Sequence, residues 1–304
     1  MSVKFQIDFK KKNSLKSQDN LQYPEEIFLQ GDNGRAVILI HGLTGTPHEM
    51  KFLANFLHRR GYSVHCPRLA NHGQPLGILK TTRWPDFYQS ARKAFIQTKD
   101  NYDLIFVSGL SVGALLSLLL AEEFPDRIAG VSCLSPTLFY DGWNAPWYQC
   151  FLPLVTWNFL KYFFYFKEDP PYGIKNKEIS KLVHRYYSTA SINDISGVAR
   201  YGYPYFPVAL LHQQNLLAKY LIRKLKDIRV PVQFIQAKDD DVTSPKNSQF
   251  IHDRIKSEIK EIILLYNSYH VITADQERDK VAEEMEKFIS RISSGSMTTR
   301  KENA

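Results

Sequence analysis

Ser111 stands in a setting that favours nucleophilic catalysis. It is the centre of Gly109-Leu110-Ser111-Val112-Gly113, a Gly-x-Ser-x-Gly pattern that follows the aliphatic run 104–107 and precedes an apolar helical stretch. So sharp a turn between strand and helix leaves no room for a side chain at Gly109 or Gly113, and it lifts the serine hydroxyl clear of the sheet. The turn also aims the helix N-terminus at a reacting carbonyl, so we expect the Val112 N–H to stabilise an oxyanion.

His270 and one residue of an acidic triplet follow Ser111 in the order that such a nucleophile requires. Where a serine lies on this kind of turn, its carboxylate and then its base come later in the chain, each just after a strand. The triplet Asp239-Asp240-Asp241 follows the apolar run 232–235, and His270 follows 262–265. We therefore expect His270 to be the general base and one carboxylate to fix its tautomer. Composition alone does not distinguish the three carboxylates.

Plainer interpretations of these residues stay open at this point. Ser111 would be idle if the motif were only a glycine-rich turn, and His270 would be a core histidine if it served one structural hydrogen bond. Ser108 and Ser117 lack flanking glycines, and Cys66 precedes a proline, which has no amide to donate, so we expect no nucleophile among them. Four histidines lie too early in the chain to be the base, because they come before the last strand, but they could line the mouth of a site: His41, His48, His65 and His72.

Strand-like and helix-like segments alternate along most of the chain. A run without polar residues, such as 36–40, suits a strand buried on both faces of a parallel sheet, and apolar residues at three-to-four spacing suit helices packed on it. The expected strands are 26–29, 36–40, 62–66, 103–107, 128–134, 232–235 and 261–265, and the expected helices are 49–60, 84–99, 112–124 and 276–292. The glycine-rich turn 31–34 suggests a hairpin-like entry. This alternation predicts an α/β fold with a doubly wound, mostly parallel sheet, whose ligands bind at the carboxyl ends of the strands.

Three segments carry a resemblance to a known family: 41–48 (HGLTGTPH), 109–113 (GLSVG) and 267–273 (NSYHVIT). Together they resemble the bacterial carboxylesterases and monoacylglycerol lipases, α/β-hydrolases of the serine aminopeptidase-type superfamily. The resemblance covers Pro24 to Ile289 apart from an insertion. It implies an α/β-hydrolase fold that carries an inserted helical cap, and a serine esterase activity.

The resemblance also distinguishes the three carboxylates. The family's acid is the fourth residue of a Gly/Ala-x-x-Asp-x-Val stretch, and that position here is Asp240. The resemblance thus implies that Asp240 orients His270, while Asp239 and Asp241 stay exposed. Only one carboxylate of an adjacent triplet is expected to point inward, because the other two would form part of a solvated loop.

The family's second oxyanion donor is the amide of the residue after His-Gly, which here is Leu43. His41 and Gly42 support it, since a glycine lets the backbone come close to the substrate. The loop 67–73 is similar to the loop that follows the next strand in the family, except that Asn71 replaces a usual glycine. That departure touches no catalytic group, but it leaves the structural role of the loop to be determined.

The insertion lies where the family carries its cap, and it is longer than in the compact bacterial members. We expect it to govern substrate choice. Its aromatic residues either pack the cap on the core or face a lipid, and both would suit an acyl-chain pocket. They include Trp143, Trp147, Tyr148, Phe151, Trp157, Phe159, Phe163, Phe164, Tyr165 and Phe166. The expected organisation is a basic extension at 1–22, a core at 23–138 and 227–292, the cap at 139–226 and a polar tail at 293–304.

Charge and cysteine usage limit the partners. With 39 Lys and Arg against 31 Asp and Glu, the net charge of +8 suits an anionic partner or simply a solvated surface. The basic clusters 10–12 and 223–226 lack the aromatic and glycine pattern of nucleic-acid motifs, so no nucleic acid is expected. Three cysteines without a CxxC pair argue against a disulfide framework and a zinc site, and they favour a reducing, cytoplasmic location.

No apolar segment of the chain looks like a signal or a membrane span. The first 20 residues lack a continuous apolar stretch, so export is not expected. The most apolar segment, 147–166, is interrupted by Pro153, Asn158 and Lys161, and it falls short of the roughly 20 residues that a spanning helix needs. We expect at most a peripheral membrane contact through the cap.

The residues and the resemblance together predict a serine hydrolase that cleaves carboxylic esters of medium or long acyl chains through an acyl-enzyme on Ser111. No cofactor or metal is expected, because no His-Glu-x-x-His or comparable cluster is present. Thioester hydrolysis and acyl transfer use the same triad and stay open. An inactive protein that binds a hydrophobic ligand or a partner is the alternative from another class, although no triad residue is missing.

Overall fold

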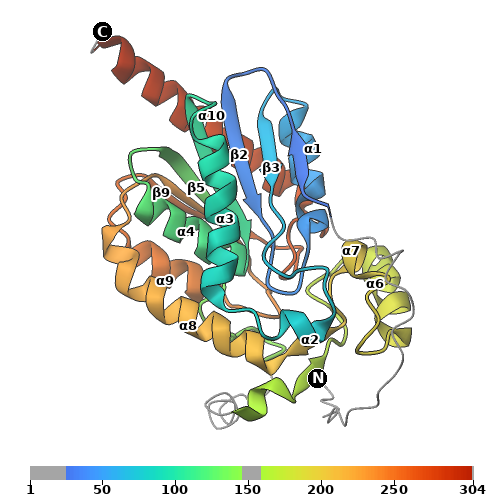
Figure 1. Ribbon diagram of the computed structural model, residues 1–304. Helices are drawn as coiled ribbons and strands as arrows, with labels where there is room; N and C mark the ends of the chain where they lie inside the picture. Colours follow the sequence, from blue (N-terminus) through green and yellow to red (C-terminus); the bar gives the residue numbers. More distant parts are fainter. Residues whose placement is uncertain (1–24, 146–158, 303–304) are drawn as a thin grey trace.

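A mostly parallel β-sheet forms the centre of the protein (Figure 1). The computed structural model describes residues 25–145 and 159–302, and within these ranges seven strands make one sheet. Across the sheet the strands are β1 (Ile27–Leu29), β3 (Ser63–Cys66), β2 (Arg35–Ile40), β4 (Leu104–Leu110), β5 (Ile128–Leu134), β8 (Val232–Ala237) and β9 (Lys260–Leu265). Only β1 is antiparallel to its neighbour. The prediction of a doubly wound α/β fold is confirmed.

The strand order reverses between β2 and β4. From β2 the chain goes to β3 on one side and then crosses to β4 on the other, so the loops after β2 and β4 diverge at the carboxyl edge of the sheet. Such a reversal opens a crevice, and open α/β sheets bind their ligands there. The loop after β2 begins at His41, and Ser111 follows β4 directly.

The entry to the sheet differs from the predicted hairpin. β1 pairs with β3, with Ile27 opposite Cys66, and not with β2. β2 is already hydrogen-bonded to parallel neighbours on both edges, which leaves no free edge for β1. The 31–34 turn instead binds the turn before β3, where the Asp32 and Asn33 N–H groups donate to Gly61 O at 2.9 and 3.0 Å. The hairpin prediction was wrong because strand pairing depends on partners distant in the sequence.

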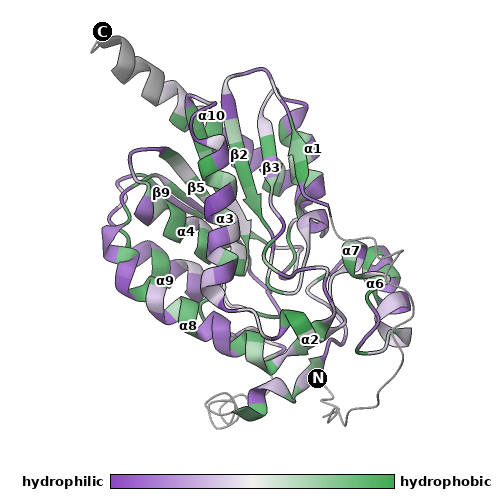
Figure 2. Ribbon diagram, viewed as in Figure 1, coloured by the Kyte–Doolittle hydropathy of each residue, from purple (hydrophilic) through white to green (hydrophobic). Residues whose placement is uncertain are grey.

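Helices cover both faces of the sheet (Figures 1 and 2). Alternate residues of β2 face opposite sides, so Val37 and Leu39 pack with α1 (Lys51–His58) and α10 (Arg278–Glu302), while Ile38 and Ile40 pack with α4 (Val112–Glu123). The α4 face also holds α3 (Trp84–Thr98), α8 (Val208–Lys224) and α9 (Lys246–Arg254). The predicted helices are present, with 49–60 divided into η1 (Pro47–Met50) and α1, and α10 runs ten residues beyond the predicted end. Two further helices, α2 (Leu76–Leu79) and α9, were not predicted.

The insertion between β5 and β8 contains several short elements. Its described part comprises η3 (Phe159–Tyr162), β6 (Tyr165–Lys167), α6 (Lys177–Thr189), α7 (Val198–Tyr201), β7 (Tyr205–Pro207), α8 and η4 (Leu225–Asp227). β6 and β7 form a separate antiparallel pair. α8 packs on α4 within the helical layer of the core, whereas α6 and α7 lie at the carboxyl edge of the sheet (Figure 1). Trp147, Tyr148, Phe151 and Trp157, predicted as cap aromatics, lie outside the described residues. The predicted domain boundaries stay a prediction.

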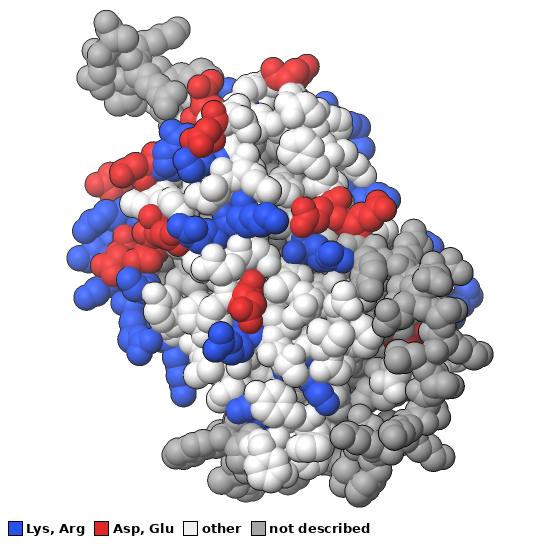
Figure 3. Space-filling view, viewed as in Figure 1, with Lys and Arg blue, Asp and Glu red and all other residues white. Residues whose placement is uncertain are grey.

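Exposed lysines and arginines gather along the side of the molecule where α8 and α9 lie (Figure 3). Acidic residues lie among them, and Lys224 pairs with Glu122 at 2.9 Å, as in an ordinary solvated face. Over 25–145 and 159–302, no helix is long and apolar enough to cross a membrane. The same ranges contain no His, Cys, Asp and Glu grouping suited to a metal ion.

Candidate active site

Ser111 lies at the point of closest approach between β4 and α4. The backbone is strained there, with φ 58° and ψ −114° at a residue that carries a side chain. A Cβ on Gly109 would lie 2.2 Å from the Gly113 backbone, and one on Gly113 would lie 2.2 Å from Ile40 O. Both glycines are therefore required by space, as the sequence predicted, and the turn presents the Ser111 side chain to the crevice.

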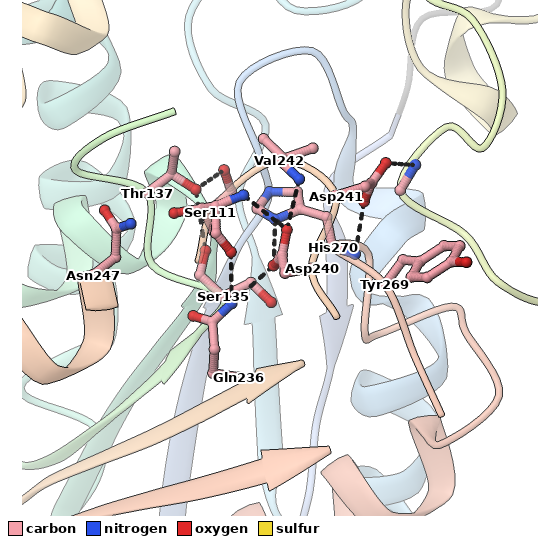
Figure 4. Close-up of polar contacts among 12 residues, drawn as sticks. Ser111, Ser135, Thr137, Gln236, Asp240, Asp241, Val242, Asn247, Tyr269 and His270 are labelled. Atoms are coloured by element: carbon pink, nitrogen blue, oxygen red, sulfur yellow. Dashed lines mark hydrogen bonds and ion pairs between the residues drawn. The ribbon is translucent and has the colours of Figure 1, made fainter. Parts of the chain in front are cut away.

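His270 and Asp240 form a buried pair beside this turn (Figure 4). His270 Nδ1 lies 2.9 Å from Asp240 Oδ2 and 3.1 Å from Oδ1. Asp240 is 2% exposed, and its carboxylate also accepts hydrogen bonds from the Val242 and Thr243 N–H groups and from Gln236 Nε2, each at 2.8 Å. These donors hold the Asp240 carboxylate in place with its oxygens against His270 Nδ1. The proton of a neutral His270 therefore lies on Nδ1, and Nε2 is free to act as a base.

The surroundings of His270 favour its protonated form. Burial lowers the pKa of His270, but the charge and hydrogen bond of Asp240 oppose this, and the charges of Asp241 and Glu49 add to the opposition. The net result is a pKa above the usual value of 6.5. A histidine tuned in this way accepts a proton more readily, as a general base must.

The Ser111 hydroxyl is hydrogen-bonded to Thr137, not to His270. Ser111 Oγ lies 3.0 Å from Thr137 Oγ1, and Figure 4 draws its side chain between those of Thr137 and His270. Thr137 in turn donates to Ser135 O at 3.2 Å, so its single proton is used and Ser111 is the donor in the pair. Ser111 and His270 line one cavity, and no hydrogen bond joins these two described residues. Proton transfer to His270 therefore requires a rotation of the serine side chain.

Two backbone N–H groups face the crevice without partners. Neither Leu43 N nor Val112 N has a hydrogen-bond acceptor within the described part of the chain. Gly42 O accepts from His41 Nδ1 at 2.8 Å and from Gly45 N at 3.3 Å. Because the peptide is planar and trans, fixing this carbonyl directs the Leu43 N–H to the opposite side. Two unpaired donors on either side of Ser111 in the chain are what the predicted oxyanion hole requires.

Buried histidines hold the loop that carries Leu43. His41 Nε2 accepts the Leu69 N–H at 3.2 Å, and His72 Nε2 lies 2.8 Å from Leu43 O. Burial lowers the pKa of both histidines and so favours their neutral forms. In His41 the partners fix the tautomer, since Nδ1 faces Gly42 O and Nε2 accepts the Leu69 N–H. Asn71, at the family's glycine position, has φ 60°, a conformation that asparagine tolerates better than other side-chain-bearing residues. Of the early histidines, His48 lines the cavity, while His41 and His72 lie behind the loop.

The prediction that Asp241 is exposed was wrong. Asp239 is exposed, but Asp241 is 3% exposed, and it accepts the N–H groups of His270 at 3.3 Å and of Gly173 at 3.1 Å. Gly173 belongs to the insertion, so one carboxylate joins the cap to the base loop. Burial raises the pKa of Asp241, a rise that His270 opposes and Asp240 increases. Two backbone donors would lose their acceptor if this side chain turned outward, which is why it stays inside.

A cavity of about 900 Å³ opens over these residues. Ser111 and His270 line it together with apolar side chains of the loop after β5 and of α8 and β7, such as Leu138, Leu211 and Phe206. Four carboxyl residues also line it: Glu49, Glu168, Asp169 and Asp241. Burial is the main cause that raises the pKa of Glu49 to about 7 and that of Glu168 to about 7. A site of this size and lining suits an elongated apolar ligand with a polar end.

Several residues around the site were not predicted. Thr137, Gln236 and Glu49 hold Ser111, Asp240 and the Gly42 loop, yet none belongs to a motif. Their contacts join segments far apart in the chain, so no spacing in the sequence could reveal them. Glu49 alone gave a signal, because an acidic residue three positions after a threonine is typical of a helix start.

The sheet, the nucleophile turn and the crevice together define an α/β-hydrolase. A family model described as "Serine aminopeptidase, S33" matches residues 31–277, and the chain belongs to this family of hydrolases. The resemblance read from the motifs is thereby confirmed.

Two curated relatives and several similar solved structures are lipases or esterases by name. The thermostable monoacylglycerol lipase of Bacillus sp. (strain H-257) is 29% identical over 282 residues, which are 89% of this chain and 98% of the relative. The carboxylesterase of Bacillus subtilis (strain 168) is 26% identical over 267 residues, covering 87% and 95%. A structure from work on the metagenome-derived lipolytic enzymes LipS and LipT has a TM-score of 0.70 at 27% identity, covering 89% and 99%. A soluble variant of Saccharomyces cerevisiae monoglyceride lipase has a TM-score of 0.68 at 17% identity, covering 94% and 99%, and shows the shared fold.

Proposed function

We propose that the protein is a serine hydrolase that cleaves carboxylic esters, with Ser111 as nucleophile, His270 as general base and Asp240 as the carboxylate that orients the base. The buried Asp240–His270 pair, beside a strained serine at the switch point of the sheet, is the observation that carries the proposal. The relatives named monoacylglycerol lipase and carboxylesterase support the same reaction class.

The reaction begins when the Ser111 side chain leaves Thr137 and turns toward His270 Nε2. The hydroxyl oxygen attacks the ester carbonyl as His270 takes its proton, and the carbonyl oxygen becomes an oxyanion that the Leu43 and Val112 N–H groups stabilise. His270 then gives the proton to the departing alcohol, which leaves an acyl group on Ser111. Water, activated by His270, attacks this acyl-enzyme, and the carboxylic acid departs with the serine regenerated.

The apolar part of the cavity suits the acyl chain. Leu138, Phe206 and Leu211 line it near Ser111, and none of these side chains offers a hydrogen bond. A panel of p-nitrophenyl esters from acetate to palmitate measures the depth of this pocket through its chain-length preference.

Active-site labelling tests the proposed function directly. A fluorophosphonate probe should label the wild-type protein at Ser111, and Ser111→Ala should abolish both labelling and ester hydrolysis. Ser117→Ala, which removes a buried α4 hydroxyl bonded to Gly113 O, is the matched control and should still be labelled. A folded wild type that neither reacts with the probe nor hydrolyses any ester would instead support a binding protein.

A peripheral lipid contact is the finer part of the proposal. Large apolar side chains are exposed on or beside three elements at one end of the molecule: Phe159 (70%) on η3, Phe163 (46%) directly after η3, Ile78 (46%) on α2 and Leu216 (39%) on α8. Lys80 Nζ donates to Tyr162 O at 2.9 Å and so joins α2 to η3. Exposed aromatics grouped in this way suit a membrane interface. In liposome flotation the wild type should bind, a Phe159→Ser/Phe163→Ser variant should not, and Phe28→Ser, at an exposed site on β1, should bind as the wild type does.

A further inference from the structure

The carboxyl group of Glu49 lies close to the nucleophile in space, with Gly42 between the two. Its Oε2 accepts the Gly42 N–H at 3.0 Å. The carboxyl fills space that Gly45 leaves open, since a Cβ on Gly45 would lie 2.0 Å from it. A Cβ on Gly42 would lie 3.8 Å from the Ser111 Cβ, so Gly42 separates the carboxyl from the serine. The Glu49 carboxyl and its hydrogen bond to Gly42 take no part in the proposed steps of ester hydrolysis.

The other oxygen of this carboxyl is available to a ligand. Glu49 lines the cavity, and its Oε1 has no hydrogen-bond partner among the residues that the structure describes. No described lysine or arginine forms an ion pair with Glu49. Burial raises the pKa of Glu49 to about 7, because the Gly42 hydrogen bond and the charge of His270 only partly offset the loss of water. A buried carboxyl with one oxygen unpaired binds best to a ligand that supplies a hydrogen-bond donor.

The surroundings of Glu49 indicate which part of an ester it would meet. Its carboxyl interacts electrostatically with His270, and His270 returns the proton to the departing alcohol. Tyr187 of α6 interacts electrostatically with Glu49 and also with Glu168, another carboxyl of the cavity. Glu49 and Glu168 both interact electrostatically with His270, so they supply acceptors on the His270 side of the cavity, whereas the side chains of Leu138, Phe206 and Leu211 supply none.

We propose that Glu49 is a specificity-determining residue whose free oxygen binds a hydrogen-bond donor, a hydroxyl or an ammonium group, on the alcohol portion of the ester. This inference rests on the proposed function, since it assigns a role within the same site. The donor lies beside the scissile bond in the bound ester. An alcohol portion of the same shape without a donor leaves the carboxyl unpaired and loses the interaction.

Matched pairs of hexanoate esters test the inference. The 2-hydroxyethyl ester is compared with the propyl ester, and the 2-(dimethylamino)ethyl ester with the 3-methylbutyl ester, so that each pair differs in a donor and not in shape. The wild type should prefer each donor ester in kcat/KM by about tenfold or more, the range of a hydrogen bond to a charged group. In Glu49→Gln the amide oxygen can still accept the Gly42 N–H, which turns the amide donor toward the cavity. The preference for the ammonium ester should then fall to near one, whereas the preference for the hydroxyl ester should only weaken, because a hydroxyl can also accept from the amide.

The kcat/KM ratio of the two esters in each pair distinguishes a loss of ligand recognition from a general disturbance of the loop. A variant that merely disturbs the loop slows both esters of a pair equally. Glu286→Gln, on α10 and bonded to Tyr62, removes a carboxyl remote from the cavity and should keep the wild-type preferences. Retention of both preferences in Glu49→Gln, or equal rates for both esters of each pair in the wild type, would overturn the inference while ester hydrolysis stands. A wild-type preference in one pair alone identifies the donor type that Glu49 binds. Absence of hydrolysis together with absence of fluorophosphonate labelling would overturn the proposed function and the inference with it.

Discussion

At the scale of single residues, Thr137 determines the orientation of the Ser111 hydroxyl before the reaction begins. Because Thr137 donates its proton to Ser135 O, the Ser111 hydroxyl points its own proton at Thr137 and away from His270. The serine must break this hydrogen bond before each acylation. A neutral hydrogen bond contributes about 0.5–1.5 kcal/mol, so the resting contact slows acylation by a small factor rather than preventing it.

Substitution of Thr137 measures this contact. Thr137→Val keeps the shape and removes the hydroxyl, so kcat/KM and the rate of fluorophosphonate labelling should rise about two- to tenfold. Thr137→Ser keeps the hydroxyl and should behave as the wild type does. Ser135 O loses a donor in the valine variant, and we expect a loss of about 1 kcal/mol in unfolding free energy. A lower labelling rate in Thr137→Val would show instead that the threonine assists the reaction.

Asp240 should determine the acid limb of the pH–rate profile. Hydrolysis requires neutral His270, so kcat/KM falls as the pH drops through the pKa of this histidine. Burial alone would lower that pKa, and Asp240 provides the main opposing effect. Asp240→Asn should therefore move the acid limb to lower pH and reduce kcat by about a thousandfold or more. Asp239→Asn, in the same triplet but exposed, should leave both unchanged, and an equal effect of the two variants would contradict the assignment.

At the scale of secondary-structure elements, Asp275 joins the insertion to the base loop. Its carboxylate accepts four backbone N–H groups, from Lys175, Asn176 and Gln276 at 2.8 Å and from Tyr269 at 2.7 Å. The first two lie at the start of α6, and the others flank His270 along the loop. Together with Asp241, this residue fixes one end of the cap, so any movement of the cap must take place elsewhere.

Loss of this carboxylate should loosen both segments at once. Asp275→Asn puts an NH₂ donor against N–H groups that need an acceptor, so we expect about 2–4 kcal/mol lower stability and about tenfold lower kcat. Hydrogen–deuterium exchange should quicken at both ends of the contact, around 175–176 and around 269–271. Asp194→Asn, which removes a half-buried cap carboxylate with one backbone donor, provides the control. Faster exchange confined to 175–176 would mean that the base loop does not depend on the cap.

Elements with an apolar pattern of their own could be predicted, and those held by distant polar contacts could not. Most strands of the main sheet were found because each has an apolar run, and Ser111 and His270 were found because each follows such a run, whereas β6 and β7 of the insertion were not predicted. The family resemblance singled out Asp240 from its triplet. Helix α9 was missed because it has no apolar stripe. It is docked instead by Asn247, which accepts the Leu138 and Phe139 N–H groups, and by Ser248, which donates to Gln236 Oε1. The inward position of Asp241 likewise depends on Gly173, a residue distant in the chain.

At the scale of the whole molecule, the sheet connects two apolar clusters, and α10 closes the smaller one. Phe288 of α10 is 1% exposed, and its ring packs on Gly130 of β5, where a Cβ would lie 3.1 Å from it. This cluster contains Leu265 and Ile272, which flank the loop that carries His270. The position of the base therefore depends on packing on the face of the sheet opposite to α4.

The two halves of α10 should consequently differ in how much they contribute to the stability of the protein. Phe288→Ala should cost about 3–5 kcal/mol of unfolding free energy and lower Tm by about 6–15 °C, because it opens a cavity against β5. Among the side chains of α10 that the structure describes, which end at Gly295, the last buried ones are Ile292 and Ser293. A chain that ends at Gly295 should therefore keep its Tm within about 2 °C and its full kcat. Thermal unfolding and p-nitrophenyl ester hydrolysis measure both effects. A large loss of Tm on truncation would show that the end of α10 packs on the protein, and an unchanged Tm in Phe288→Ala would show that this cluster does not hold the base loop.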